Sequence, residues 1–274
     1  MSLSSTLVSA LVSAYGRANR WGVFRSAAAR GLFVRSYFAY KRLIEDAFAS
    51  LVRKRPDLFA GGHIIDVGAN VGYTATVFAR AVSPGFQVYA FEPEARNFED
   101  LERTVARRNM KGVVVPVRLA AGEKEGEVEL WCNEAHHADH RIATDALRAS
   151  GLPVKRTIRL PMVSVDGFLE QRRIGGPIKF VKIDVQGYEL AVCRGMVATM
   201  SRNPDLDIAV EYCPAAIKEI GDEPAALPAF FSGRGYAISI LRGDGELLPA
   251  DPVTLARIIA ERGYVDLLCT LPHA

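Results

Sequence analysis

Four acidic residues of this chain each lie within or directly after a short apolar segment of the kind that forms a buried strand: Asp66, Glu92, Asp184 and Glu211. In open α/β sheets, ligands bind at the edge where the carboxyl ends of the parallel strands meet. A carboxylate at the end of an apolar strand is costly to bury unless it is solvated or paired. For Asp184 this cost favours a role in a site, with Lys182 as a candidate partner.

The segment from His63 to Gly72 predicts a strand, a tight turn and the start of a helix. This order is the nucleotide-binding opening of a doubly wound α/β sheet. Gly68 allows the chain to turn sharply, and Gly72 allows a ligand or a helix to approach the backbone. About twenty residues later, Glu92 ends the second predicted strand, where a carboxylate accepts hydrogen bonds from ribose hydroxyls.

The turn Gly68-Ala69-Asn70-Val71-Gly72 lacks the middle glycine of a dinucleotide-binding turn. Asp66 also brings negative charge to the position where a pyrophosphate would bind. S-adenosylmethionine has a ribose but no phosphate, and carboxylates attract its sulfonium and amine. The residues therefore favour this cofactor over NAD. At the end of the third predicted strand, the small side chains around Ala121 leave room for a flat base.

A polar segment near residue 140 contains three imidazoles, a carboxylate and a guanidinium: His136, His137, Asp139, His140 and Arg141. These residue types could ligate a divalent metal. They could equally hold a general base and an anion-binding arginine over the cofactor pocket, or form a solvent-exposed loop. The three alternatives stay open.

Apolar strands and amphipathic helices alternate over residues 61–274, which predicts one α/β domain with a mostly parallel sheet. The expected strands follow the apolar segments at 64–67, 87–91, 113–119, 156–165, 178–183, 207–210, 236–241 and 265–271. A hairpin at 123–131 interrupts the alternation. The last two strands are expected to pair antiparallel, which is more typical of a methyltransferase than of a dehydrogenase.

Residues 1–60 are predicted to form a helical extension. Residues 1–44 contain seven basic and no acidic residues, and their leucines recur at helical spacing. Such a basic amphipathic helix can lie on an anionic membrane surface, or pack on the domain with its arginines in water. The segment lacks the leading positive charge of a secretory signal, and its uncharged part is too short to span a bilayer.

The composition is that of a soluble globular protein, with 49% hydrophobic and 24% charged residues. A net charge of +3 does not indicate nucleic-acid binding. The four cysteines are far apart, without metal-binding or redox spacing, which predicts reduced thiols and a cytoplasmic protein. Peripheral contact with the inner face of the membrane through the basic N-terminus is the alternative location.

Three motifs, in this order and spacing, resemble those of the FkbM family of S-adenosylmethionine-dependent methyltransferases. The first is Ile-Asp-Val-Gly-Ala-Asn-Val-Gly-Tyr at 65–73, with Phe-Glu-Pro at 91–93. The others are Val-Ser-Val-Asp-Gly-Phe-Leu at 163–169 and Val-Lys-Ile-Asp-Val-Gln-Gly-Tyr-Glu-Leu at 181–190. The resemblance implies a Rossmann-like class I methyltransferase fold. Its seven-stranded sheet would have an antiparallel last strand and helices on both faces.

The resemblance also implies O-methylation of a hydroxyl on a sugar, a glycan or glycolipid, or a secondary metabolite. The residues that it places around the methionine part of the cofactor are Asp66, Gly68, Asn70 and Gly72. Glu92 would bind the ribose, and Asp184 would face the methyl-transfer centre. The family usually has Glu where this chain has Gln186. If that acid binds a metal or a basic substrate group in the family, this chain lacks it.

A hydroxyl is a poor nucleophile at neutral pH, so a general base or a metal should assist the transfer. The candidate bases are Asp184, His140 and Asp139. Arg141 is a candidate for binding an anionic group of the acceptor, and Glu211 is a second acceptor-binding candidate. Two other function classes stay open: an NAD- or nucleotide-sugar-binding enzyme, and a non-catalytic cofactor-binding module at the membrane surface.

Overall fold

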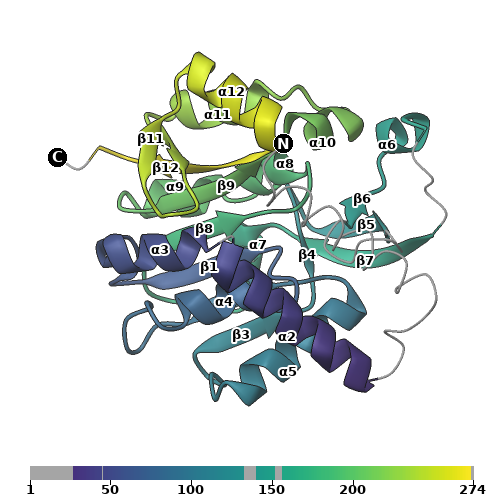
Figure 1. Ribbon diagram of the computed structural model, residues 1–274, viewed down its shortest axis with the longest axis vertical. Coiled ribbons are helices and arrows are strands. Elements are labelled where there is room, and N and C mark those ends of the chain that lie inside the picture. Colours follow the sequence, from purple (N-terminus) through teal and green to yellow (C-terminus); the bar gives the residue numbers. More distant parts are fainter. Residues whose placement is uncertain (1–26, 45, 133–139, 152–155, 273–274) are drawn as a thin grey trace.

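An eight-stranded mixed sheet crosses the protein in the order β11-β10-β12-β9-β8-β1-β2-β3. It is seen in a computed structural model that describes residues 27–44, 46–132, 140–151 and 156–272 (Figure 1). The strands are β1 (His63–Val67), β2 (Val88–Phe91), β3 (Val114–Val117), β8 (Ile178–Ile183), β9 (Asp207–Tyr212), β10 (Ala237–Leu241), β11 (Leu247–Pro249) and β12 (Val265–Thr270). Four of them, β1, β2, β8 and β9, end directly before a predicted site residue or contain one.

The strand directions confirm the predicted doubly wound arrangement. β1 pairs parallel with β2 and β8, and β8 pairs parallel with β9. The last strand, β12, is antiparallel to both β9 and β10, as predicted. The short strand β11 adds an eighth member at the edge, beyond the seven that were expected. In the β1 register, Val67 lies opposite both Phe91 and Ile183, so these three strands end at the same level.

A second, four-stranded sheet was not predicted. It has the order β4-β7-β5-β6 and consists of β4 (Ala120–Ala121), β5 (Gly126–Trp131), β6 (Arg141–Ile142) and β7 (Thr157–Val163). The sequence indicated β5 and β7 as separate strands, but β5 pairs antiparallel with β7 along its whole length. The two partners are about thirty residues apart in the chain, so no short turn signal links them.

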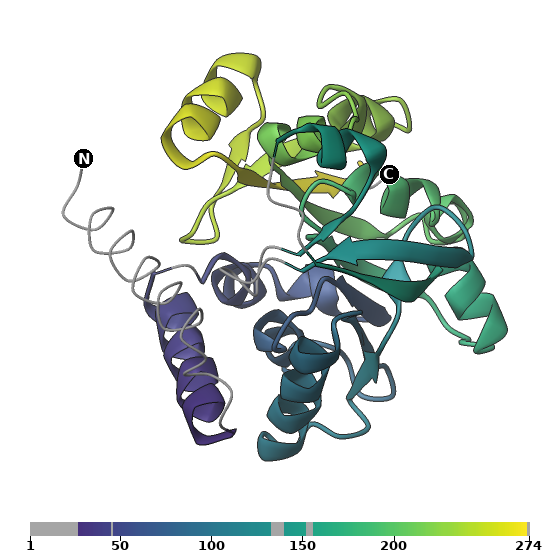
Figure 2. The same cartoon turned by 90° about the vertical axis from the view of Figure 1, so that its right-hand side faces the viewer.

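Helices cover both faces of the large sheet (Figures 1 and 2). On one face lie α3 (Ala47–Lys54), η2 (Pro56–Phe59), α4 (Tyr73–Phe78) and α5 (Ala95–Arg107). On the other lie α7 (Val165–Gln171), α8 (Glu189–Arg194), α9 (Val197–Arg202), α10 (Pro214–Glu219) and α11 (Ala226–Ser232). The remaining helices are α2 (Ala27–Ile44), α6 (Asp145–Ala149) and α12 (Pro252–Arg262). Ile64 and Ile65 enter opposite core clusters, since strand side chains alternate between faces.

The described part of the predicted N-terminal extension packs on the domain. Leu51, Leu58 and Phe59 are fully buried in the same core cluster as Ile64 of β1. The amphipathic stretch predicted within residues 1–26 lies outside the described residues. Among the helices that the structure describes, none is long and apolar enough to span a membrane.

Gly68 is the position where the backbone around β1 is most constrained. It has a left-handed φ of +80°, and an added Cβ would lie 1.9 Å from the Asp184 carbonyl oxygen. Gly85 has a similar φ of +89°, but an added Cβ would meet nothing within 4 Å. The two glycines therefore separate the cost of the left-handed conformation from the cost of close packing.

We expect Gly68→Ala to lower the free energy of unfolding by about 3 kcal/mol or more, because overpacking is added to left-handed strain. Gly85→Ala should cost only about 1–2 kcal/mol, from the strain alone. Urea unfolding of both variants measures the difference. Equal losses in the two variants would contradict the close contact between the turn and β8.

Candidate active site

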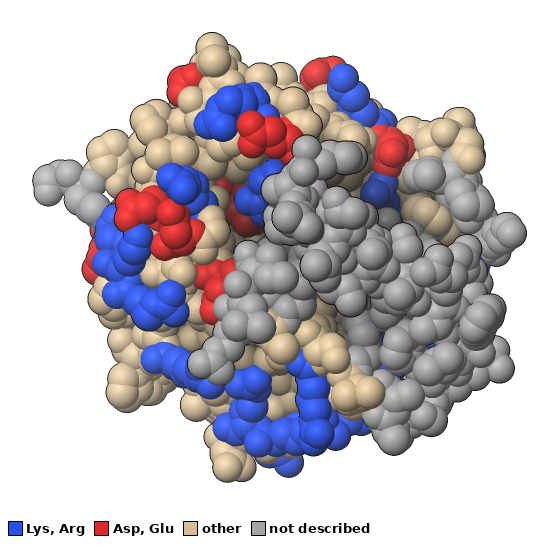
Figure 3. Space-filling model, viewed as in Figure 1, with Lys and Arg blue, Asp and Glu red and all other residues tan. Residues whose placement is uncertain are grey.

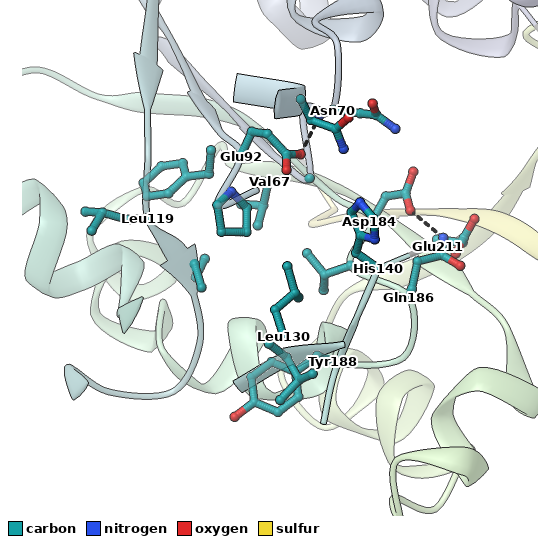
Figure 4. Close-up of a pocket in the computed structure, with 18 of the residues that line it drawn as sticks. Val67, Asn70, Glu92, Leu119, Leu130, His140, Asp184, Gln186, Tyr188 and Glu211 are labelled. Carbon is teal, nitrogen blue, oxygen red and sulfur yellow. Dashed lines mark hydrogen bonds between the residues drawn. The ribbon is translucent and has the colours of Figure 1, made fainter. Parts of the chain in front are cut away.

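A cavity of about 390 Å³ opens at the carboxyl ends of β1, β2, β8 and β9 (Figure 4). Its size is within the range of small-molecule sites. The second sheet forms part of its wall through Leu130 and Ile142, and α2 contributes Tyr37 and Lys41. The topology thus brings together strand ends that are far apart in the sequence, at the edge where the sequence predicted a site.

The turn after β1 is shaped by its neighbours. Asn70 has a left-handed φ of +50°, which asparagine tolerates better than most residues. Its backbone N–H donates to Glu92 Oε2 at 3.0 Å. Gly72 precedes α4, and an added Cβ there would lie 2.7 Å from Leu101 Cδ1. Gly72 therefore permits α5 to pack against the turn, and it does not line the cavity.

Glu92 is a buried carboxyl group at the end of β2. In addition to Asn70, the Glu94 N–H donates to its Oε1 at 3.0 Å. Burial raises the pKa of Glu92 to about 8, with a further contribution from the charge of Glu94. Each oxygen accepts one N–H, and the protonated group can still exchange hydrogen bonds with a diol, as a donor and as an acceptor. It lines the cavity as predicted.

Asp66 lies behind the cavity wall rather than in it. Its side chain is fully buried, 3.4 Å from the ammonium of Lys182. Burial raises the pKa of Asp66, and Lys182 opposes that shift. The Lys182 ammonium also lies 3.3 Å from Asp184 Oδ2 and donates to the Gly68 carbonyl at 3.2 Å. The predicted partnership of Lys182 with Asp184 is confirmed, and the same ammonium also binds the glycine turn.

Lys182 determines the charge of the groups around it. Burial alone would lower its pKa, but the carboxylates of Asp184 and Asp66 outweigh burial and raise it. For Asp184, burial is likewise outweighed by Lys182 and by a hydrogen bond from Gln186, so its pKa is lowered. Asp184 is therefore ionised at neutral pH, and its side chain is 34% exposed.

Gln186 connects Asp184 to a second acid. Its Nε2 donates to Asp184 Oδ1 at 3.0 Å and to Glu211 Oε2 at 2.9 Å (Figure 4). Burial and the neighbouring charge of Asp184 raise the pKa of Glu211 well above its usual value. The pKa values of the two carboxyl groups are thus shifted in opposite directions. Such a difference is typical of acid–base sites.

The polar segment contributes one described residue to the cavity, His140. Arg141 does not line it and forms an ion pair with Glu219. The prediction that Arg141 binds an acceptor is therefore not supported by its position, because a carboxylate already occupies its guanidinium. His136, His137 and Asp139 lie outside the described residues. Within the described ranges, no group of three or more His, Cys, Asp or Glu side chains could hold a metal.

Of the predicted cofactor-binding residues, four line the cavity: Gly68, Asn70, Glu92 and Ala121. The sequence reasoning missed Tyr37, Lys41 and Tyr188, which line it as well. Tyr188 lies in the third motif and could have been included from its position next to Gly187. Tyr37 and Lys41 of α2 had no local signal, because nothing in the helical pattern indicates which face of that helix packs on the domain.

Comparison with known proteins identifies the family. The methyltransferase FkbM domain matches residues 66–238. This chain belongs to the FkbM methyltransferase family. The predicted family and enzyme class, a methyltransferase, are therefore confirmed. The β12 direction and the two helical layers agree with the predicted class I fold.

The individual proteins that resemble this chain have low sequence identity to it. The hexuronic acid methyltransferase AglP of Haloferax volcanii is 27% identical over 132 residues, which are 48% of each chain. This chain thus spans about half the length of that curated relative. The FkbM methyltransferase structure from Methylobacillus flagellatus is similar with a TM-score of 0.47 and 14% identity, over 77% of this chain and 44% of that one. An O-methyltransferase structure from Bacillus cereus, in complex with SAH, is similar with a TM-score of 0.46 and 12% identity, over 86% of this chain and 88% of that one.

The raised pKa of Glu92 predicts a pH-dependent stability. Between its ordinary value of 4.5 and about 8, the folded protein holds a proton that the unfolded chain releases. The free energy of unfolding should therefore fall as pH rises from about 5 to 8. Glu92→Gln removes the titrating group, so the fall in stability between pH 5 and 8 should be smaller in the variant than in wild type. The amide oxygen can accept only one of the two backbone N–H groups, so the slope, and not the absolute stability, is the test.

Thermal or urea unfolding from pH 5 to 8 measures the effect in the ligand-free protein. Glu102→Gln, at an exposed position of α5, is the matched control and should keep the wild-type slope. If Glu92→Gln keeps that slope too, Glu92 is not a buried proton-holding group.

Proposed function

We propose that this protein transfers a methyl group from S-adenosylmethionine to a hydroxyl of a sugar or sugar-containing acceptor. The observation that carries the proposal is the ionised Asp184 at the end of β8, in a cavity whose other end has the ribose-type acid Glu92. Family membership supplies the class of reaction. The site supplies the arrangement of the groups that bind the cofactor and handle the proton.

The residues present fit this cofactor. Glu92 is a buried carboxyl group that can exchange hydrogen bonds with the two ribose hydroxyls, and Ala121 and Leu119 leave an apolar wall for a base. The turn at Gly68 and Asn70 would hold the methionine part. When bound, S-adenosylmethionine supplies an electrophilic methyl group on a sulfonium. Asp184 provides the negative charge that this end of the cavity needs beside a cation.

Asp184 is the proposed proton acceptor. Asp184 would take the proton of the acceptor hydroxyl when that oxygen receives the methyl group, which the bound cofactor would supply. The amide of Gln186 and the ammonium of Lys182 hold the carboxylate in place. His140 also lines the cavity and is the second candidate base. General bases of this type contribute about 10²–10⁴-fold to the rate.

The acceptor class rests on more distant support. AglP is described as a hexuronic acid methyltransferase, and a glycan acceptor agrees with that relative. We also propose a cytoplasmic location with peripheral membrane contact when the acceptor is a glycolipid. Figure 3 shows Lys and Arg side chains gathered on the lower part of one face, where Figure 1 places α5. Exposed basic residues of this helix and its C-terminal cap include Arg103, Arg107 and Arg108.

The test separates cofactor binding from chemistry. By calorimetry, S-adenosylhomocysteine should bind wild type and Asp184→Asn with affinities within about threefold of each other, and NAD should bind neither. With radiolabelled S-adenosylmethionine and a panel of sugar acceptors, Asp184→Asn should lose at least about 10² in turnover. Asp205→Asn, an exposed position at the opposite end of the sheet, is the control and should keep wild-type turnover.

Melting curves establish that Asp184→Asn is folded, since the substitution removes one partner of Lys182. Binding of NAD in place of S-adenosylhomocysteine would refute the proposed cofactor. Wild-type turnover in Asp184→Asn would leave the cofactor assignment intact and remove Asp184 from the proton transfer.

A further inference from the structure

Helix α2 lies outside the part of the chain that matches the family, yet it is anchored on the domain. Arg30 is buried, forms an ion pair with Asp100 of α5 and donates to Asn97 Oδ1 at 3.1 Å. Figures 1 and 2 show α2 running beside α5 in both views. Removing one partner of a buried ion pair is strongly destabilising, so this contact fixes the helix in place.

The second half of α2 is held by aromatic contacts. The Phe38 ring meets the Tyr73 ring edge-on, with 5.1 Å between centroids. Arg108, the C-terminal cap of α5, places its guanidinium carbon 4.5 Å from the centroid of the Phe38 ring. Tyr73 is the first residue of α4, directly after the glycine turn. The helix is therefore positioned against the cofactor-binding turn itself, and Tyr37 and Lys41 line the cavity.

Lys41 differs in charge from the rest of the wall. Among the described residues that line the cavity, the acids are Glu92, Asp184 and Glu211, and Lys41 is the only Lys or Arg. Lys182 lies behind the wall and already contacts three oxygens. Among the described residues that line this cavity, Lys41 of α2 is thus the one lysine or arginine that an acidic acceptor would meet.

We propose that α2 is part of the active site and that Lys41 binds a carboxylate of an acidic sugar acceptor. This inference rests on the proposed function and names the acceptor class more narrowly, as a uronate. It moves the anion-binding role, predicted for Arg141, to a residue that faces the cavity. Charge-assisted hydrogen bonds of this kind contribute more than neutral ones.

Lys41 lines the same cavity as Asp184 and Glu211. After Lys182 and Gln186, its charge helps to lower the pKa of Asp184. Burial raises the pKa of Asp266 to about 6, and the charge of Lys41 opposes that shift. Asp266 lies opposite Glu211 in the pairing of β12 with β9. The charge of Lys41 is therefore within electrostatic reach of Asp184, in the lining of the same cavity. A uronate held there would present its hydroxyls to Asp184, the proposed proton acceptor.

Saturation-transfer NMR with glucuronate and glucose as probes, on protein saturated with S-adenosylhomocysteine, tests the proposal. Wild type should bind glucuronate about tenfold more tightly than glucose. Lys41→Met should lose that preference, and Lys41→Arg should retain most of it. Arg35→Met, at an exposed position of the same helix, is the matched control and should bind as wild type.

Calorimetry with S-adenosylhomocysteine on the same variants separates the two proposals. Unchanged cofactor binding in Lys41→Met together with lost glucuronate preference supports the role of Lys41. A wild type without preference for glucuronate, or a Lys41→Met variant that keeps it, overturns that role. Absence of S-adenosylhomocysteine binding in wild type would instead refute the proposed function.

Discussion

The ammonium of Lys182 is the interaction on which the site depends. It is almost fully buried between Asp66, Asp184 and the carbonyl of Gly68. A buried charge is tolerated only when it is paired and hydrogen-bonded. Because its partners lie on β1, on the turn after β1 and after β8, this single group joins the two central strands at their carboxyl ends. The contact with Lys182 also holds Asp184 at its position in the cavity.

The contacts of Lys182 also influence the pKa values of the acidic groups that line the cavity. Lys182 and Gln186 keep Asp184 ionised, and burial together with the charge of Asp184 raises the pKa of Glu211. Burial also raises the pKa of Glu92. The cavity therefore has one carboxylate, Asp184, and two carboxyl groups that hold protons more tightly. A cationic cofactor is attracted to the first, and hydroxyls can exchange hydrogen bonds with the others.

Much of this arrangement was predictable because it arises from local patterns. The strand–turn–helix at Ile64–Gly72, the acid after β2 and the Asp184–Lys182 pair each follow from a few consecutive residues and the rule for parallel strand ends. The residues whose positions were predicted wrongly depend on contacts between segments that are far apart in the sequence. Asp66 lies behind the wall because the ammonium of Lys182 is there, and Arg141 is paired with Glu219. The pairing of β5 with β7 and the docking of α2 likewise have no local signal in the sequence.

The most direct test is a crystal structure of the protein with S-adenosylhomocysteine. We expect the ribose hydroxyls to hydrogen-bond to Glu92, the base to lie by Ala121, and the sulfur to face Asp184 beside α2. A ligand bound elsewhere, or bound with its ribose away from Glu92, would contradict this arrangement.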